Sequence, residues 1–235
     1  MNLESCFPFL TEKGHVVSLV GGGGKTTLLY AMASCCARKG WNVLVSTTTH
    51  IMKPPDNVWA ETAAARDILW KSGCYAVSGS AAQGGKLTMP PAQQLTQWMK
   101  MADLTLIEAD GAKRMPCKAP AAHEPVILPQ CDTVLAVAGA SALGKPLKTV
   151  CFRAEQAAEL LGVSPDAALT PERLAKLLSS DQGGRKLVGS RAFYAVLNQV
   201  DTPQRRLLGK QTLDILRERY QVAGVLTQFE EGERA

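Results

Sequence analysis

The sequence lacks a long apolar run, a basic leader and paired cysteine motifs. No stretch approaches the about 18 consecutive apolar residues of a membrane-spanning helix, so we expect no membrane partner. Residues 1–5 carry no basic segment and no apolar run follows them, so we expect no signal peptide and a cytoplasmic location. The seven cysteines include no Cys-x-x-Cys pair, which argues against a disulfide framework or a zinc site and favours reduced thiols.

A concentrated charge of one sign is missing as well. The formal net charge is only +5, and Lys and Arg are scattered along the chain rather than gathered in a basic stripe. We therefore expect no nucleic-acid partner. With 235 residues, 46% of them hydrophobic and 20% charged, the chain has the composition of a globular protein, and we expect a single domain over residues 1–235.

Short apolar runs alternate with longer amphipathic segments along the chain. The runs predict strands at residues 15–20, 42–46, 104–109, 133–138, 193–198 and 222–227. The amphipathic segments predict helices at residues 25–39, 59–71, 153–161, 171–179 and 203–220. Because the runs are apolar on both faces, the pattern predicts an α/β fold: an open, mostly parallel sheet flanked by helices, similar to the three-layer fold of P-loop NTPases. Residues 74–78 and 85–88 predict a small hairpin insertion around 74–91, off the main sheet.

A glycine-rich segment, V-G-G-G-G-K-T-T, joins the first predicted strand to the first predicted helix. Glycines let backbone N–H groups turn toward phosphate oxygens, and the helix N-terminus adds partial positive charge. We expect the lysine to reach the β- and γ-phosphates and the first threonine to ligate Mg²⁺. Leu19 stands where G-x-x-x-x-G-K-[ST] has its first glycine, so the segment is similar to the shorter G-x-x-G-K-T-T form; the alternative is a glycine-rich turn with no ligand. The predicted nucleotide-binding residues here are Gly21, Gly22, Gly23, Gly24, Lys25, Thr26 and Thr27.

Two carboxylates follow the apolar run 104–107. Glu108 and Asp110 lie on the same side of an extended chain, because side chains alternate with period two. Such a pair suits Mg²⁺ and a positioned water, and the N–H group of Gly111 would reach the γ-phosphate. We predict Lys25, Glu108 and Asp110 as catalytic residues. We predict Thr26, Glu108 and Asp110 as metal ligands. The alternative is a strand that runs into a solvent-exposed acidic turn.

Two further segments have the features of a substrate-binding or switch element. Thr48 follows the second predicted strand, where its hydroxyl would contact the metal or phosphate, or else cap the next segment. The loop 113–125 is rich in proline and carries ionisable side chains beside the expected nucleotide; the alternative is a rigid surface connection. The predicted residues of this loop are Lys113, Lys118, His123 and Glu124.

The fifth predicted strand ends in Asn198-Gln199-Val200-Asp201. Guanine-binding proteins often place N-K-x-D at such a strand end, with the Asp accepting hydrogen bonds from the base. Gln199 replaces the lysine of that pattern. We therefore weigh Asn198 and Asp201 as base contacts against a turn in which Asp201 or Thr202 caps the next helix.

Three strings resemble the YqeC-type family. They are V-G-G-G-G-K-T-T, then S-T-T-T-H-I-x-x-P, then E-A-D-G-A-K-x-x-P-x-K-A-P-A-x-H-E-P-V-I, and the resemblance extends from the first predicted strand to residues 198–201. Members of this family are named as accessory factors for selenium-dependent molybdenum hydroxylases or as selenium cofactor biosynthesis proteins. The resemblance implies a P-loop domain and a role in maturing a molybdenum hydroxylase cofactor. The matching positions are Gly24, Lys25, Thr26, Glu108, Asp110, Gly111, Lys118, His123 and Glu124.

The sequence therefore predicts an accessory protein that binds Mg²⁺ with ATP or GTP and acts as an NTP hydrolase or phosphoryl transferase. Its partners would be the nucleotide and a molybdenum hydroxylase or its pterin cofactor. The alternatives are a non-hydrolysing nucleotide- or molybdopterin-binding chaperone and a small-molecule kinase.

Overall fold

Strand β1 (His15–Gly21) lies in the middle of a seven-stranded sheet. The computed structural model describes residues 2–229, so the ends of the domain predicted over 1–235 lie outside the described residues. The strand order is β12-β11-β9-β1-β7-β2-β4, and every pairing in this sheet is parallel. The other strands are β2 (Val43–Thr47), β4 (Ala76–Val77), β7 (Leu104–Glu108), β9 (Thr133–Gly139), β11 (Ala192–Asn198) and β12 (Ala223–Leu226).

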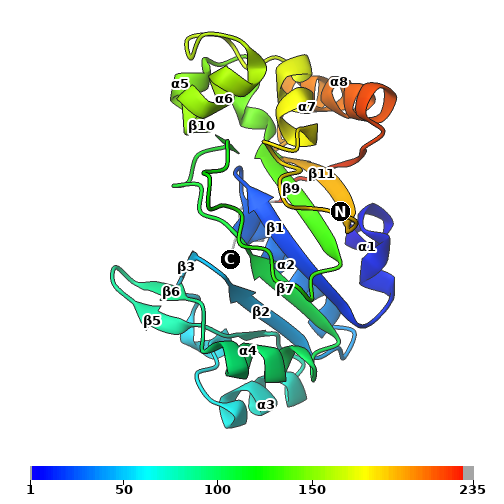
Figure 1. Cartoon of the computed structure of the whole chain (residues 1–235). Coiled ribbons are helices and arrows are strands. Elements are labelled where there is room, and N and C mark those ends of the chain that lie inside the picture. The colour runs from blue at the N-terminus through cyan, green and yellow to red at the C-terminus, as the bar shows by residue number, and fades with distance from the viewer. Residues whose placement is uncertain (1, 230–235) are drawn as a thin grey trace.

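Helices cover both faces of this sheet (Figure 1). On one face, α2 (Lys25–Ala37) packs with α1 (Leu3–Cys6) and the short 3₁₀ turn η1 (Pro8–Thr11). The other face carries α3 (Ala63–Lys71), α4 (Ala92–Met99), α5 (Leu147–Val150), α6 (Ala154–Leu161), α7 (Pro171–Ser179) and α8 (Pro203–Tyr220). Two further 3₁₀ turns are η2 (Asp56–Val58) and η3 (Ala140–Ala142). The predicted fold class, an open and mostly parallel sheet between helical layers, is confirmed.

Burial on both faces explains why the strands read as continuous apolar runs. All residues of β2, β7 and β9 are buried. In β2, Val43 and Val45 pack toward the α2 side, whereas Leu44 packs against Trp70 and Trp98 of α3 and α4 on the other side. Alternate side chains thus enter opposite cores, as a central parallel strand requires.

Two small sheets stand beside the main one. β3 (His50–Met52), β6 (Lys86–Thr88) and β5 (Ser80–Ala82) pair antiparallel, while β8 (Cys117–Lys118) pairs with β10 (Cys151–Phe152) in parallel. A hairpin off the main sheet is present within residues 74–91, as expected, but β5 and β6 form it and residues 74–78 do not. β4 instead joins the main sheet beside β2, and the partner of β6 is β5.

The helix predicted from residue 59 begins later, at Ala63. The Thr62 side chain caps it by accepting a hydrogen bond from the Ala65 N–H, and Trp59 instead forms a bridge to Val77. Helix α4 follows two prolines and was not indicated by the sequence pattern. Within residues 2–229, no helix has both the length and the apolar character needed to cross a membrane.

Candidate functional site

The glycine-rich loop between β1 and α2 fits tightly against neighbouring backbone. Gly23 and Gly24 have φ angles of 76° and 98°, a region that favours glycine. A Cβ atom at Gly23 would lie 2.0 Å from the backbone nitrogen of Gly139, and one at Gly24 would lie 2.6 Å from Asn198 Nδ2. Glycine is therefore required at both positions by conformation and by the space available.

The N–H groups of the first three loop glycines bond within the protein. Gly22 donates to the Val137 carbonyl at 2.8 Å and Gly23 to the Met115 carbonyl at 3.0 Å. Gly21 donates to the Asp110 carboxylate, at 3.1 and 3.0 Å to its two oxygens. Helix α2 begins after Gly24, which has no side chain to cap it, so the first-turn N–H groups at residues 25–27 have no capping side chain. The backbone N–H groups without a capping partner from a side chain are therefore those at the start of α2.

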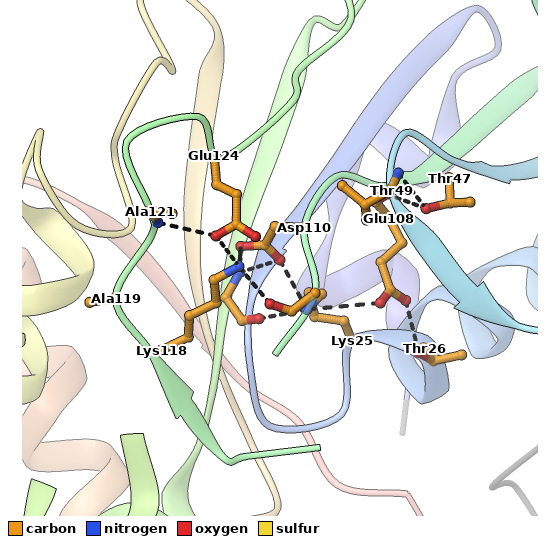
Figure 2. Close-up of polar contacts among 12 residues, drawn as sticks. Lys25, Thr26, Thr47, Thr49, Glu108, Asp110, Lys118, Ala119, Ala121 and Glu124 are labelled. Atoms are coloured by element: carbon orange, nitrogen blue, oxygen red, sulfur yellow. Dashed lines mark hydrogen bonds and ion pairs between the residues drawn. The ribbon is translucent and has the colours of Figure 1, made fainter. Parts of the chain in front are cut away.

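Thr26 and Glu108 meet where β7 ends beside the start of α2. The Thr26 hydroxyl donates to Glu108 Oε2 at 2.8 Å, and Glu108 Oε1 lies 3.9 Å from Lys25 Nζ (Figure 2). On the neighbouring strand, the Thr47 hydroxyl donates to the Glu108 carbonyl at 2.9 Å and accepts from the Thr49 N–H at 3.0 Å. These contacts hold the Glu108 carboxylate and the hydroxyl groups of Thr26 and Thr47 at the carboxyl edge of the sheet.

Asp110 binds two lysines. Lys25 Nζ lies 3.0 Å from its Oδ1 atom and also donates to the Gly21 carbonyl at 2.5 Å. Lys118 Nζ lies 2.9 Å from Asp110 Oδ2. Asp110 is only 2% exposed, so both ion pairs are shielded from water. The carboxylate thus occupies an anion-binding position formed by a loop N–H group and two ammonium groups.

Lys118 links the charged cluster of Lys25, Glu108 and Asp110 to the loop that follows β7. Its ammonium group lies 2.7 Å from Glu124 Oε2 and donates to the Gly111 carbonyl at 2.6 Å. Glu124 Oε2 also accepts from the Ala121 N–H at 3.1 Å and from Arg153 Nη1 at 2.7 Å. Figure 2 shows the Lys118 ammonium group between Asp110 and Glu124. The loop after β7 is therefore tied to the glycine-rich loop through charged contacts.

Burial and neighbouring charge shift several pKa values in this cluster. Burial raises the pKa of Glu108 above its usual value, although Lys25 and the Thr26 hydroxyl act in the opposite direction. Burial tends to lower the pKa of Lys25, but Asp110 and Glu108 outweigh it and raise the value. Burial tends to raise the pKa of Glu124, but hydrogen bonds from Lys118 and the Ala121 N–H lower it. Lys25 and Glu124 are therefore held in their charged forms, whereas the charged form of Glu108 is disfavoured.

The donor set at Thr26 and Glu108 suits a hard cation that is only partly held by protein. Mg²⁺ prefers oxygen ligands and commonly keeps several waters while binding one or two carboxylates and substrate phosphates. Among residues 2–229, no cluster of three His, Cys, Asp or Glu side chains forms a metal site on its own. Thr26 and Glu108 therefore supply only part of the oxygen ligands that such a cation takes. Asp110, also predicted as a ligand, is ion-paired with two lysines.

The other predicted loop residues lie at the rim of the cluster. The Thr48 hydroxyl donates to the Val126 carbonyl at 2.7 Å, while its N–H donates to the Glu108 carbonyl. Lys113 is exposed, with its ammonium group 5.0 Å from the centre of the Phe152 ring, and His123 is exposed. Thr48 therefore reaches the acidic strand end through its backbone rather than through its side chain.

Asn198 lies against the glycine-rich loop, whereas Asp201 lies near the surface. Asn198 Nδ2 donates to the Gly23 carbonyl at 3.1 Å, and Asn198 is 3% exposed. Asp201 pairs with Arg205, with 2.5 Å between Oδ1 and Nη1. Thr202 rather than Asp201 caps α8, since its side chain accepts from the Arg205 N–H at 3.2 Å.

Sequence reasoning missed Arg153 and the contact between Cys117 and Cys151. Arg153 lies 29 residues from Glu124, and nothing in the local sequence links the two. Cys117 pairs in register with Cys151, and its pKa is raised first by a hydrogen bond with that thiol and then by burial. A buried thiol that is disfavoured as thiolate packs as a small apolar side chain, and it is a free thiol, as expected from the sequence.

The comparisons with known proteins agree on one family. A family model described as "YqeC protein" matches residues 17–155, which include the glycine-rich loop, the end of β7 and the loop through Glu124. "Uncharacterized protein YqeC" of Escherichia coli (strain K12) is 36% identical over 187 residues, covering 75% of this chain and 72% of that protein.

Proposed function

The chain belongs to the YqeC family, and we propose that it binds a Mg·nucleoside triphosphate at the start of α2 and hydrolyses it. The observation that carries this proposal is the hydrogen bond from Thr26 to Glu108, at 2.8 Å, beside Lys25. A hydroxyl, a carboxylate and an ammonium group thus meet at a helix N-terminus. This combination suits a polyphosphate and its metal ion.

Each residue of the cluster has a role in this proposal. The N–H groups at residues 25–27 would bind phosphate oxygens, and Lys25 would balance the charge of the β- and γ-phosphates. Thr26 and Glu108 would hold Mg²⁺, which supplies further neutralisation of phosphate charge. Glu108, whose pKa is raised by burial, is suited to position a water or accept its proton. Lys118 and Glu124 would hold the neighbouring loop in place.

The ion pairs of Asp110 support a second candidate function. A carboxylate held by the ammonium groups of Lys25 and Lys118 is not free to activate water. This favours a non-hydrolysing chaperone that binds a nucleotide or molybdopterin. Steady phosphate release that is lost in Glu108→Gln supports hydrolysis; tight binding with no release supports the chaperone.

Isothermal titration with ATP, GTP and CTP tests the binding proposal. Lys25→Ala is expected to abolish binding, because the cation nearest the phosphates is lost. Lys39→Ala is the matched control, since Lys39 lies just beyond the other end of α2 and pairs with Glu4. Retained micromolar affinity in Lys25→Ala would contradict the proposal.

The biological setting is proposed from the sequence resemblance alone. We place the protein in the maturation of a selenium-dependent molybdenum hydroxylase cofactor, as the family resemblance implies. Activation of an apo-hydroxylase by purified protein, with and without nucleotide, tests this assignment. Activation that is independent of the protein would contradict it.

A further inference from the structure

The loop after β11 is fixed to the glycine-rich loop by Asn198. Its Nδ2 atom donates to the Gly23 carbonyl at 3.1 Å. Its Oδ1 atom accepts from the Gln199 N–H at 2.8 Å and from the Thr227 hydroxyl at 3.1 Å. The buried amide of Asn198 therefore joins three segments, the glycine-rich loop, the end of β11 and the end of β12. It positions the following residues and has little capacity left for a ligand.

Gln199 lies over the start of α2. Its φ angle is 64°, and its Oε1 atom accepts a hydrogen bond from the Ser141 hydroxyl at 2.5 Å. A Cβ atom at Gly24 would lie 3.9 Å from Gln199 Nε2. The Gln199 side chain thus extends from the end of β11, past Ser141, toward the site proposed for the phosphates. A base attached to those phosphates would reach the same carboxyl edge of the sheet.

Asp201 follows two residues later and does not cap the next helix. Thr202 caps α8, and Asp201 Oδ1 contacts Arg205 at 2.5 Å near the surface. The Asp201 side chain is 34% exposed, and a carboxylate has about four acceptor positions, so one pairing leaves most of them for a ligand.

We propose that Asp201 reads the base of the bound nucleotide and selects guanine. An ionised carboxylate only accepts hydrogen bonds, so a two-oxygen contact requires two adjacent donors. Guanine presents N1–H beside its 2-amino group. Adenine and cytosine present a ring acceptor beside an amino group, and uracil presents one donor between two carbonyls. This inference rests on the proposed nucleoside triphosphate site and names the nucleotide it takes.

Competition titrations with Mg²⁺ and GTP, ITP, ATP or XTP test this assignment. The wild-type protein is expected to bind GTP at least about tenfold more tightly than ITP, which lacks the 2-amino group, and than ATP. Asp201→Asn is expected to lose about tenfold in GTP affinity and to gain XTP affinity, because the new amide donates to the 2-carbonyl of xanthine. The control is Asp214→Asn, since Asp214 is also an exposed carboxylate on α8 and pairs with Arg217 at 2.9 Å. It is expected to behave as wild type.

The outcomes separate the two proposals. Equal affinity for GTP, ITP and ATP would overturn guanine selection while leaving the triphosphate site intact. An equal loss of all four nucleotides in Asp201→Asn would also overturn it, because it would show a structural role. Failure of the wild-type protein to bind any triphosphate would overturn the proposed function itself.

Discussion

The Thr26 hydroxyl donates to Glu108 Oε2 at 2.8 Å, although the two residues are 82 positions apart in the sequence. The contact exists because β1 and β7 are adjacent and parallel, with Leu19 opposite Glu108 in the register. The chain leaving β1 enters α2 directly, so the first turn of that helix lies beside the end of β7. The fold thus brings a hydroxyl and a carboxylate together at the edge where parallel α/β sheets bind ligands.

Lys118→Met is expected to destabilise the protein by about 3–5 kcal/mol, because it leaves Asp110 and Glu124 buried without their shared cation. Urea unfolding at neutral pH measures the change. Lys113→Met is the control, since Lys113 is exposed and its ammonium group lies over the Phe152 ring, and a loss of about 0.5–1 kcal/mol is expected there. Equal effects for the two variants would show that the buried ion pairs contribute little.

Glu108→Gln is expected to raise stability at neutral pH while impairing any phosphate release. The folded-state pKa of Glu108 is raised, mainly by burial. Its contribution to stability is therefore fully present below the unfolded pKa of about 4.3 and is lost as pH rises through the folded pKa. Urea midpoints of wild type and variant should thus separate as pH increases from 4 to 7. The exposed Glu155→Gln is the control, and a gap that is constant with pH would refute this assignment.

Gly24→Ala is expected to cost more stability than Gly40→Ala. Both residues have left-handed φ angles, 98° and 79°, so both variants lose about 1–2 kcal/mol. Only the new methyl group at position 24 meets Asn198 Nδ2, at 2.6 Å, and it would displace the hydrogen bond from Asn198 to Gly23. A further loss of about 1 kcal/mol is expected, with weaker nucleotide binding. Thermal unfolding compares the two; equal costs would mean that the Asn198 contact does not matter for stability.

Local signals predicted much of the fold. Helices α7 and α8 have the bounds predicted for them, and each begins where a threonine cap precedes a proline, at Thr170 and Thr202. Strand β4 was misassigned because two buried residues carry no periodicity, and its pairing with β2 is a tertiary choice. Helix α4 has only Leu95, Trp98 and Met99 as buried residues, too few to indicate a period.

The candidate site was only partly predictable for the same reason. Lys25 and Thr26 belong to a contiguous motif, and Glu108 follows an apolar run, so their types and spacing were visible in the sequence. The ion pairs of Asp110 with Lys25 and Lys118 depend on how loops fold onto one another. No local pattern encodes such contacts, which is why the sequence predicted Asp110 as a metal ligand without indicating its lysine partners.

The most direct test of the central claim is the dependence of nucleotide binding on Mg²⁺ in wild type and in Thr26→Val. Titrations of both proteins with the best-bound triphosphate, with Mg²⁺ and with EDTA, give four affinities. We expect Mg²⁺ to tighten binding to the wild type at least about tenfold, and we expect Thr26→Val to lose this gain while keeping its metal-free affinity. Affinities that do not respond to Mg²⁺ in the wild type, or an unchanged response in Thr26→Val, would contradict the assignment of Thr26 and Glu108 as the metal-holding pair.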